Sequence, residues 1–376
     1  MKVALACDWF LPRMGGIELH LRDLALALRA RGVDARIVTT TPGDEQVDGI
    51  PVHRVPAALA PGASFAVSPR LFGRVRALIA REEFDIVHAH ASVVSPVAYA
   101  AALGAARLRL PSVLTFHSML HRTSALLGMS EGLFGWSRGR IVLSAVSSVV
   151  ATQAARWIPE ADVGVLPNGV DTTFWRAGPP HTNEAEIVFV TAMRLSRKKR
   201  PLALIDAFAA LTRFVAGAPA LRLIIAGEGP ERPAMLRRAA ELGIAATVQL
   251  VGQLERPALR ELYGRAHVFV LPSERESFGI AALEARTAGL PVVAMRASGA
   301  RDFIVHGVNG LLASDDAELV RLMTRLAIDQ PFRRYLAARN SASPPPYDWR
   351  DVAELHLQLY ATAAALRNGS EPVSQR

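Results

Sequence analysis

The sequence is poor in cysteine and lysine and contains no long apolar run. Its one cysteine, Cys7, excludes an intrachain disulfide framework and fits a reducing compartment. The longest stretch without Asp, Glu, Lys, Arg or His covers residues 91–106 and contains Pro96, whereas a membrane-spanning helix needs roughly 18 apolar residues. The four apolar residues after Lys2 are too few for the hydrophobic region of a secretory signal. We therefore expect a cytoplasmic protein.

The 376 residues are 51% hydrophobic and 20% charged, which is typical of a globular chain of two or three domains. Aromatic residues make up only 6% and no nucleic-acid recognition motif is present. We therefore expect no nucleic-acid partner, despite the net charge of +9. The positive charge instead favours phosphate-bearing ligands or anionic lipid.

Lysine occurs only at Lys2, Lys198 and Lys199, so 43 basic residues minus these three leaves 40 arginines. An ammonium is a compact point charge, whereas a guanidinium is a planar fork. The adjacent pair Lys198 and Lys199 therefore indicates a site that needs point charges. Chance retention of both lysines on a solvated surface is the alternative.

Short apolar runs alternate with longer amphipathic segments along the chain. This βαβ order predicts parallel sheets with helices on both faces. We expect two Rossmann-like domains, residues 1–175 and 176–345, that face each other across a cleft, and a last helix and tail over 346–376 that pack back towards the first domain. The apolar runs lie at residues 3–6, 35–39, 85–88, 112–115, 141–146, 163–166, 187–191, 221–226, 247–251, 268–271 and 292–294.

Ligands of parallel sheets bind beyond the carboxyl ends of the strands, so the residues there are candidate site residues. Gly15 and Gly16 stand at a helix entrance, where free amides can hold an anion, although taken alone the pair is better explained by an ordinary tight turn. His88, His90 and His117 end two strands and can donate to a sugar hydroxyl or move a proton. For His88 a structural role is the alternative. With one cysteine and no H-E-x-x-H motif, we expect no metal.

The second half of the chain carries a cationic loop at residues 193–201, which suits a diphosphate. The next strand runs into a close-approach turn at Gly227. Residues 271–285 turn from strand to helix, and the free amides there can hold a phosphate. In this stretch Glu276 can bind sugar hydroxyls, and Glu284 can bind a ribose diol. Glu284 has apolar neighbours, which argues against a solvated helix face.

Taken in order, these motifs resemble a retaining glycosyltransferase of family 4 with the GT-B fold, similar to phosphatidylinositol mannosyltransferases. The resemblance extends over nearly the whole chain. It rests on Gly15-Gly16-Ile17-Glu18, residues 84–90, Thr115-Phe116-His117, residues 166–171, Arg194 with Lys199, residues 226–230, Glu276 eight residues before Glu284 in an E-x7-E spacing, and residues 288–294.

The resemblance implies transfer of a hexosyl or N-acetylhexosaminyl group from a nucleotide diphosphate sugar to a hydroxyl of a lipid-linked or soluble acceptor. It implies front-face displacement, with no cofactor and no metal. The implied catalytic residues are His117, Arg194, Lys199 and Glu276; the donor-binding residues are Gly16, Lys198, Gly227, Ser277, Phe278, Gly279, Ile280 and Glu284; the acceptor-binding residues are Gly15, Glu18, His20 and His90.

The sequence departs from the family pattern at two places. Arg200 stands where the family usually has glycine, which leaves open whether Lys198 or Lys199 binds the diphosphate. The loop that often ends in glutamate has Asp302 instead.

Residues 70–81 form an amphipathic pattern with Arg70, Arg74 and Arg81 off the apolar face. Such a helix can rest on an anionic membrane, here the inner face, or can simply pack in the domain. A nucleotide-sugar 2-epimerase of the same architecture is the alternative function. The sequence does not indicate the oligomeric state.

Overall fold

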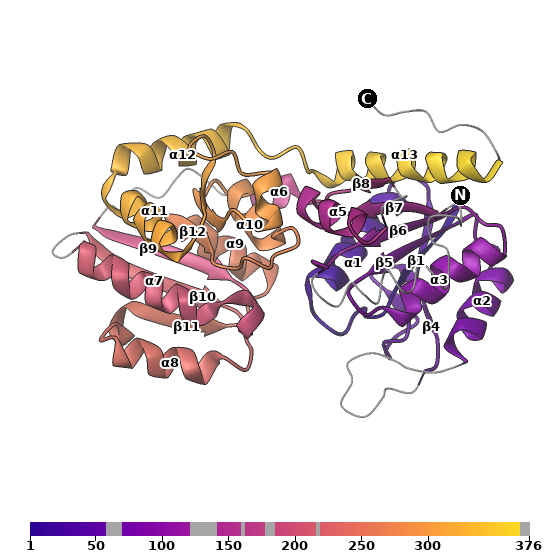
Figure 1. The fold of residues 1–376 in the computed structure, drawn as a ribbon, viewed down its shortest axis with the longest axis horizontal. Helices are drawn as coiled ribbons and strands as arrows, with labels where there is room; N and C mark the ends of the chain where they lie inside the picture. The colour runs from indigo at the N-terminus through magenta and orange to yellow at the C-terminus, as the bar shows by residue number, and fades with distance from the viewer. Residues whose placement is uncertain (58–69, 121–140, 159–161, 177–184, 216–218, 369–376) are drawn as a thin grey trace. The chain divides into compact units, whose positions relative to one another are not determined.

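The computed structural model describes residues 1–57, 70–120, 141–158, 162–176, 185–215 and 219–368. The chain divides into two compact units, Met1–Gly169 with Tyr347–Arg376, and Val170–Pro346 (Figure 1). The described residues of each unit form one sheet. The two α/β units with parallel sheets confirm the fold class expected from the sequence.

The described part of the first unit contains an eight-stranded sheet in the order β3-β4-β2-β1-β5-β6-β7-β8. Its strands are β1 (Lys2–Cys7), β2 (Asp34–Thr39), β3 (Gln46–Val47), β4 (Ile50–Arg54), β5 (Ile86–Ala91), β6 (Ser112–Phe116), β7 (Ile141–Ala145) and β8 (Val163–Val165). All neighbours are parallel except β3 and β4, a hairpin that turns at Asp48-Gly49. The sequence analysis missed this hairpin, although Asp-Gly is a usual hairpin signal.

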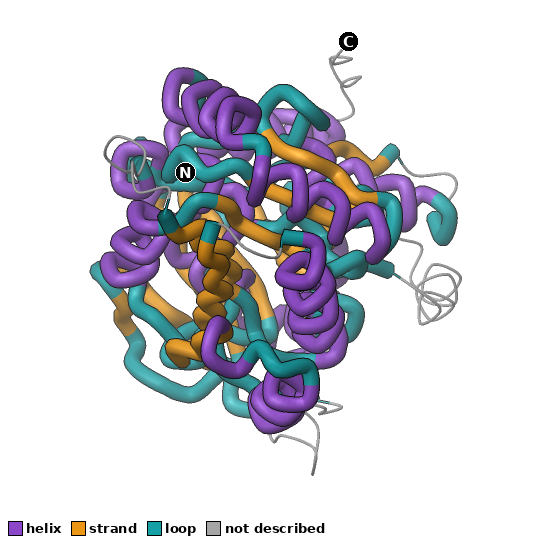
Figure 2. The backbone as a smooth tube through the Cα atoms, turned by 90° about the vertical axis from the view of Figure 1, so that its left-hand side faces the viewer, coloured by secondary structure: helices purple, strands orange, loops and turns teal. Residues whose placement is uncertain are grey.

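Helices cover both faces of this sheet, and each face has its own buried cluster. In Figure 2, which faces the left-hand side of Figure 1, helices likewise flank the strands. Because side chains alternate along a strand, Leu5 of β1 faces one core and Ala6 the other. Tyr360 joins the core of Leu5 from the far end of the sequence. The helices among the described residues of this unit are α1 (Gly16–Arg29), α2 (Leu71–Arg81), α3 (Pro96–Arg107), α5 (Ser148–Ala155) and α13 (Trp349–Asn368).

The second unit contains a six-stranded parallel sheet in the order β11-β10-β9-β12-β13-β14. Its strands are β9 (Glu186–Ala192), β10 (Ala220–Ala226), β11 (Val248–Gly252), β12 (Val268–Leu271), β13 (Val292–Met295) and β14 (Gly310–Ala313). Its helices are α6 (Thr172–Trp175), α7 (Pro201–Phe214), α8 (Arg232–Glu241), α9 (Arg256–Arg265), α10 (Ile280–Thr287), α11 (Asp316–Ile328) and α12 (Gln330–Ala342), with short 3-10 turns η2 (Arg197–Lys199), η3 (Ala245–Thr247) and η4 (Gly299–Asp302).

The strand order of each sheet changes direction once. In the first unit the chain adds strands on one side of β1 and then continues with β5 on the other side. In the second unit the same change of direction lies between β9 and β12. At such a point the loops after the two adjacent strands separate, which leaves room for a ligand at the carboxyl edge of the sheet. The loops that follow these four strands are therefore the candidate ligand-binding loops.

Candidate active site

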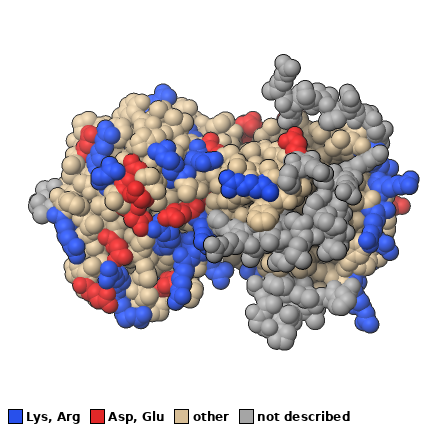
Figure 3. Space-filling view, viewed as in Figure 1, with Lys and Arg blue, Asp and Glu red and all other residues tan. Residues whose placement is uncertain are grey.

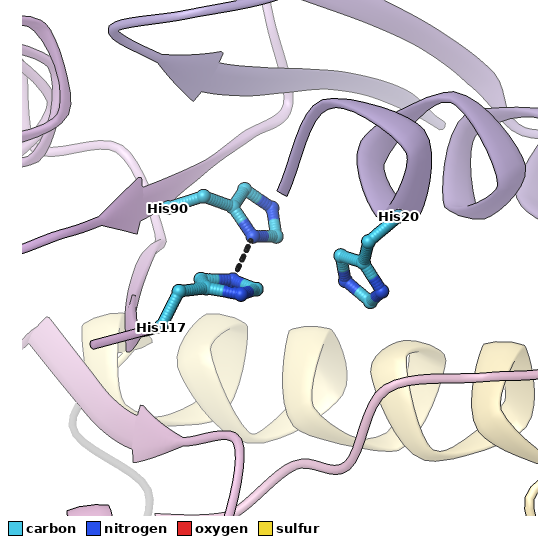
Figure 4. Close-up of side chains that lie close together, drawn as sticks. All are labelled: His20, His90 and His117. Atoms are coloured by element: carbon cyan, nitrogen blue, oxygen red, sulfur yellow. Dashed lines mark hydrogen bonds between the residues drawn. The ribbon is translucent and has the colours of Figure 1, made fainter. Parts of the chain in front are cut away.

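Three histidines meet at the carboxyl edge of the first unit's sheet (Figure 4). His90 lies at the end of β5, His117 directly follows β6, and His20 comes from the first turns of α1. The Nδ1 of His90 and the Nε2 of His117 are 2.9 Å apart and share a hydrogen bond. The ring of His20 lies 5.2 Å from that of His117. The structure thus brings together two acceptor-site candidates and one catalytic candidate of the same unit.

Burial keeps these three rings neutral at pH 7. Burial, and to a lesser extent the nearby His356, lowers the pKa of His117 to about 3. Burial, together with the other histidines around them, also holds the pKa values of His20 and His90 well below the usual value. Neutral imidazole carries one N–H donor and one acceptor nitrogen. Among the described residues, the Nδ1 of His20 and the Nε2 of His90 have no hydrogen-bond partner, so both rings retain hydrogen-bonding capacity for a ligand.

His88 packs against this cluster through the ring of His90. Its Nε2 lies 2.6 Å from the hydroxyl of Thr115 and its Nδ1 lies 3.0 Å from the hydroxyl of Tyr360, while its ring stacks 3.9 Å from that of His90. Both nitrogens are therefore satisfied, as the structural alternative for His88 requires. Trp349, at the start of α13, lies 5.3 Å from the ring of His20. Sequence reasoning missed both aromatic residues of α13, because no local pattern links them to the histidines.

The glycine pair before α1 has a packing reason of its own. A side chain on Gly15 would come within 2.3 Å of the carboxylate of Glu18. Glu18 is itself buried and lies 3.6 Å from Arg13. Gly16 is the first residue of α1, where backbone amides without helical partners begin. The acceptor-site candidates Gly15 and Glu18 thus contact each other, and Gly16 keeps the geometry expected of an anion-binding helix start.

Asp8 is a further candidate that the sequence analysis passed over. It directly follows β1, and its Oδ1 accepts a hydrogen bond of 3.0 Å from the amide of Val97 near the start of α3. Burial raises the pKa of Asp8 to about 6, and its Oδ2 atom has no hydrogen-bond partner in the part of the chain that the structure describes. Its position after a strand at the change of direction was the available signal.

In the second unit, Lys199 and Glu276 form the central contact. Lys199 lies in the loop after β9 and Glu276 in the loop after β12, and the Nζ and Oε2 atoms are 2.5 Å apart. The side chains are 27% and 12% exposed, so the pair is accessible yet largely desolvated. Arg194 stands exposed in the same loop as Lys199. This loop therefore presents cations beside a carboxylate.

Lys198 has a different environment from Lys199. Its surface is exposed, but its ammonium lies among protein atoms and near Lys199 and Arg275. This desolvation, followed by the repulsion from Lys199, lowers the pKa of Lys198. The backbone oxygen of Lys198 accepts a bond of 3.3 Å from the hydroxyl of Ser273. Of the two lysines, Lys199 makes the contact with Glu276.

Gly227 allows backbone to approach backbone. It has φ of 133°, and a side chain there would come within 1.9 Å of the carbonyl oxygen of Met193. The loop that carries Arg194 therefore requires glycine at position 227. The structure shows protein rather than open space at this point, so a donor contact of Gly227 would have to come from its backbone.

The turn from β12 to α10 presents backbone amides rather than side chains. Gly279 caps α10 with φ of 95°, in the left-handed region that favours glycine. The side chain of Phe278 is buried against Phe303, 5.4 Å between ring centres. The carbonyl oxygen of Glu276 accepts a hydrogen bond of 2.8 Å from the amide of Gly299. This bond connects the turn to the loop that follows β13. Ser277 and Ile280 flank this turn.

Glu284 is buried on α10, with 8% of its surface exposed. This burial excludes the solvated helix face that its spacing from Glu276 could also have produced. Together with burial, the charge of Glu284 raises the pKa of the Tyr263 hydroxyl. Glu284 therefore lies inside the unit, on the helix that follows the turn from β12.

Within the described ranges, His20, His90 and His117 form a group whose possible metal-ligand atoms lie within 4.8 Å of one another. Three neutral imidazoles are suitable ligands for zinc. The hydrogen bond between His90 and His117, however, already uses one nitrogen of each ring. No carboxylate completes the group. The arrangement of the three rings therefore favours hydrogen bonding over metal binding.

The two halves of the chain match two family models. Residues 14–174 match Glycosyltransferase Family 4, and residues 174–342 match Glycosyl transferases group 1. Together they cover most of the sequence and meet near the division between the units. The chain therefore belongs to the GT-B glycosyltransferases related to family 4.

Similar proteins align with nearly the whole chain. Glycogen synthase of Mycobacterium tuberculosis (strain CDC 1551 / Oshkosh) is 29% identical, over 96% of this chain and 94% of its own length. Phosphatidyl-myo-inositol mannosyltransferase of Mycobacterium leprae is 28% identical, over 97% of each. The crystal structure of Anabaena Alr3699/HepE in complex with UDP matches with a TM-score of 0.77 at 22% identity, over 96% of this chain and 100% of that chain. The last comparison supports the fold.

Proposed function

We propose that the protein is a retaining glycosyltransferase that moves a hexosyl or N-acetylhexosaminyl group from a nucleotide diphosphate sugar to an acceptor hydroxyl. The observation that carries the proposal is the Lys199–Glu276 contact between the two loops at the change of direction of the second sheet. A cation there can neutralise a leaving diphosphate, while the carboxylate binds sugar hydroxyls. Solved structures of Anabaena Alr3699/HepE with UDP and with UDP-glucose support this donor class.

The proposed reaction is front-face displacement. The bond from the anomeric carbon to the diphosphate oxygen breaks as the acceptor oxygen forms its bond on the same face, and the acceptor proton passes to the leaving diphosphate. Arg194 and Lys199 stabilise the charge on that leaving group. His117, neutral at pH 7, donates a hydrogen bond to the transferred sugar, and Glu276 positions the sugar. The proposal uses no metal and no cofactor.

The remaining donor contacts follow from the same turn. Residues 278–280 lie at the start of α10, and we assign a phosphate to their amides, although an eight-residue helix contributes only part of the binding. Glu284 is assigned to the ribose. On the other unit, the acceptor contacts are assigned to Gly15, Glu18, His20 and His90.

The acceptor is either lipid-linked or soluble. Two similar proteins illustrate the two classes by name, a phosphatidyl-myo-inositol mannosyltransferase and a glycogen synthase. Within the described residues no helix combines the length and apolar character needed to cross a bilayer. A lipid acceptor would require attachment at the membrane surface.

Any such attachment would rest on arginine rather than on apolar insertion. The apolar residues Leu71, Val75 and Ile79 of α2 are buried in the core beside α3, so this face is not available to lipid. Arg74 and Arg81 remain exposed and line a groove of about 730 Å³ between β4 and α2. Figure 3 shows basic side chains gathered at the edge of the first unit where Figure 1 places α2. We propose an electrostatic membrane contact through Arg70, Arg74 and Arg81.

The donor assignment is tested by a screen of nucleotide sugars for thermal stabilisation, because a ligand that binds the folded state raises its apparent stability. The stabilising donor is then incubated with the protein alone and with lipid and sugar acceptors. Transfer with retention of the anomeric configuration supports the proposal. Release of an epimerised sugar without any acceptor would replace it with the epimerase.

The roles of the central pair are tested with Lys199→Ala and Glu276→Ala. Each is expected to lower turnover about a hundredfold or more, because each removes a preorganised contact to reacting groups. Circular dichroism and melting temperature check that both variants fold. Wild-type turnover in either variant would refute the role assigned to that residue.

A further inference from the structure

Arg200 holds a backbone conformation that side chains disfavour. It follows Lys199, caps the start of α7, and has φ of 55° and ψ of 45°. A residue with a β-carbon is strained in this left-handed region, where glycine is not. The family resembled by the sequence usually has glycine at this place. A strained residue of this kind persists where its surroundings require it, and it often marks a functional constraint.

The side chain of Arg200 accounts for this constraint. Its Nη1 donates a bond of 3.0 Å to the carbonyl oxygen of Pro272 and lies 3.1 Å from a carboxylate oxygen of Glu274. Its Nη2 donates bonds of 2.6 and 2.8 Å to the two carboxylate oxygens of Asp316. Pro272 and Glu274 follow β12, and Asp316 begins α11. One guanidinium thus ties the loop after β9 to two other segments.

The same two loops carry the lysine and the glutamate of the proposed donor site. The Lys199–Glu276 pair and the bond from Ser273 to the carbonyl of Lys198 link them directly. Arg200 adds a third link immediately next to Lys199. A guanidinium is planar and presents its donors in a fixed fork, so it fixes the separation of the segments that it joins more tightly than an ammonium can.

We propose that Arg200 is a positioning residue for the donor site: it holds the loop of Lys199 against the loop of Glu276, so that the ammonium stands ready for the diphosphate. This inference rests on the proposed function of that site. The ion pairs of Arg200 are partly exposed, with side-chain exposures of 24% for Arg200 and about half for its two carboxylate partners. Exposed pairs contribute little to stability. The effect of Arg200 is therefore on the geometry of Lys199, and preorganised geometry governs both binding and turnover.

The test measures nucleoside diphosphate affinity by calorimetry. UDP, GDP and ADP are titrated into the wild-type protein, and the tightest binder is used throughout. Arg200→Ala and Arg200→Gly are each expected to weaken its binding about tenfold. Arg238→Ala is the matched control, because Arg238 also contacts two carboxylates, 2.7 Å to Asp206 and 3.3 Å to Glu241, but lies on α8. The control is expected to bind as the wild type does.

The glycine variant separates positioning from stability. It removes the side chain and also relieves the left-handed strain, so its melting temperature is expected to lie above that of Arg200→Ala. Its affinity is nevertheless expected to be as weak as that of the alanine variant. Wild-type affinity in both Arg200 variants would overturn the inference.

A double-mutant cycle identifies the group through which Arg200 acts. In a Lys199→Ala background, Arg200→Ala is expected to change the affinity about twofold or less, because the ammonium to be positioned is gone. A full tenfold loss in that background would overturn the positioning role and make Arg200 an independent contact to the anion. If the wild type binds no nucleoside diphosphate, or if Lys199→Ala binds it normally, the proposed donor site fails rather than the role of Arg200 alone.

Discussion

The buried histidines of the first unit predict a steep loss of stability in mild acid. His20, His88, His90, His117 and His356 are each at most 5% exposed. Burial is the largest cause of the lowered pKa in every case, and the pKa values of His117 and His356 fall to about 3 and about 4. Each ring therefore becomes protonated at a lower pH in the folded protein than in the unfolded chain.

The sign and size follow from proton linkage. Between the unfolded pKa near 6.5 and the lower folded pKa, the unfolded state binds more protons, so stability falls as pH falls. From pH 7.5 to 5.5 each such histidine costs about 1.4 kcal/mol, and the five together cost about 7 kcal/mol. Asp8 opposes this, because its folded pKa is raised to about 6 and it takes up a proton in the folded state. Asp8 offsets only about 1 kcal/mol of the stability lost through the histidines. The net loss of stability is a large part of a typical folding free energy of about 5 to 15 kcal/mol.

Hydrogen exchange measured by mass spectrometry at the two pH values reports this loss separately for each unit. Peptides of β1, β5 and β6 report the first unit, and the rates are corrected for the intrinsic effect of pH. The control is His356→Gln, which can still donate to the carbonyl of Val352 but does not titrate. It is expected to lower the pH-dependent loss by about 1.4 kcal/mol. A change below about 1.5 kcal/mol in the wild-type protein would refute the interpretation of five buried neutral histidines.

Three further predictions use simpler assays. Lys198→Ala is expected to lower kcat/KM less than about tenfold and Lys199→Ala about a hundredfold or more, and the reverse order would move the diphosphate contact to Lys198. The wild type is expected to sediment with anionic vesicles and be released by salt, whereas a variant with the three arginines of residues 70–81 named above changed to glutamine is not; equal binding would leave α2 as a packing helix. Activity is expected to survive EDTA, and a loss restored by zinc would assign a metal to the three histidines of Figure 4.

The sequence alone determined most of the strands and the loops that carry charge, although it did not indicate β3, β4 or β14. Apolar runs of strand length are local signals, and each of the runs singled out in the sequence corresponds to a strand of the structure. Parallel topology then places the residue after each strand at one edge of a sheet. For this reason the loops of Lys199 and Glu276 could be chosen as donor-site candidates before any contact was known. The scarcity of lysine strengthened that choice.

Contacts between distant residues were decided only by the tertiary structure. The pair Lys199 and Glu276 is 77 residues apart, and His88 and Tyr360 are 272 apart. Composition and periodicity extend over one element, so they cannot tell which strands become neighbours or where α13 packs. The same limit hid the packing reason for Gly15, and it left open whether the apolar face of α2 meets lipid or α3. In each case the deciding factor is which surfaces the packed core brings together, because burial there is a property of the whole unit.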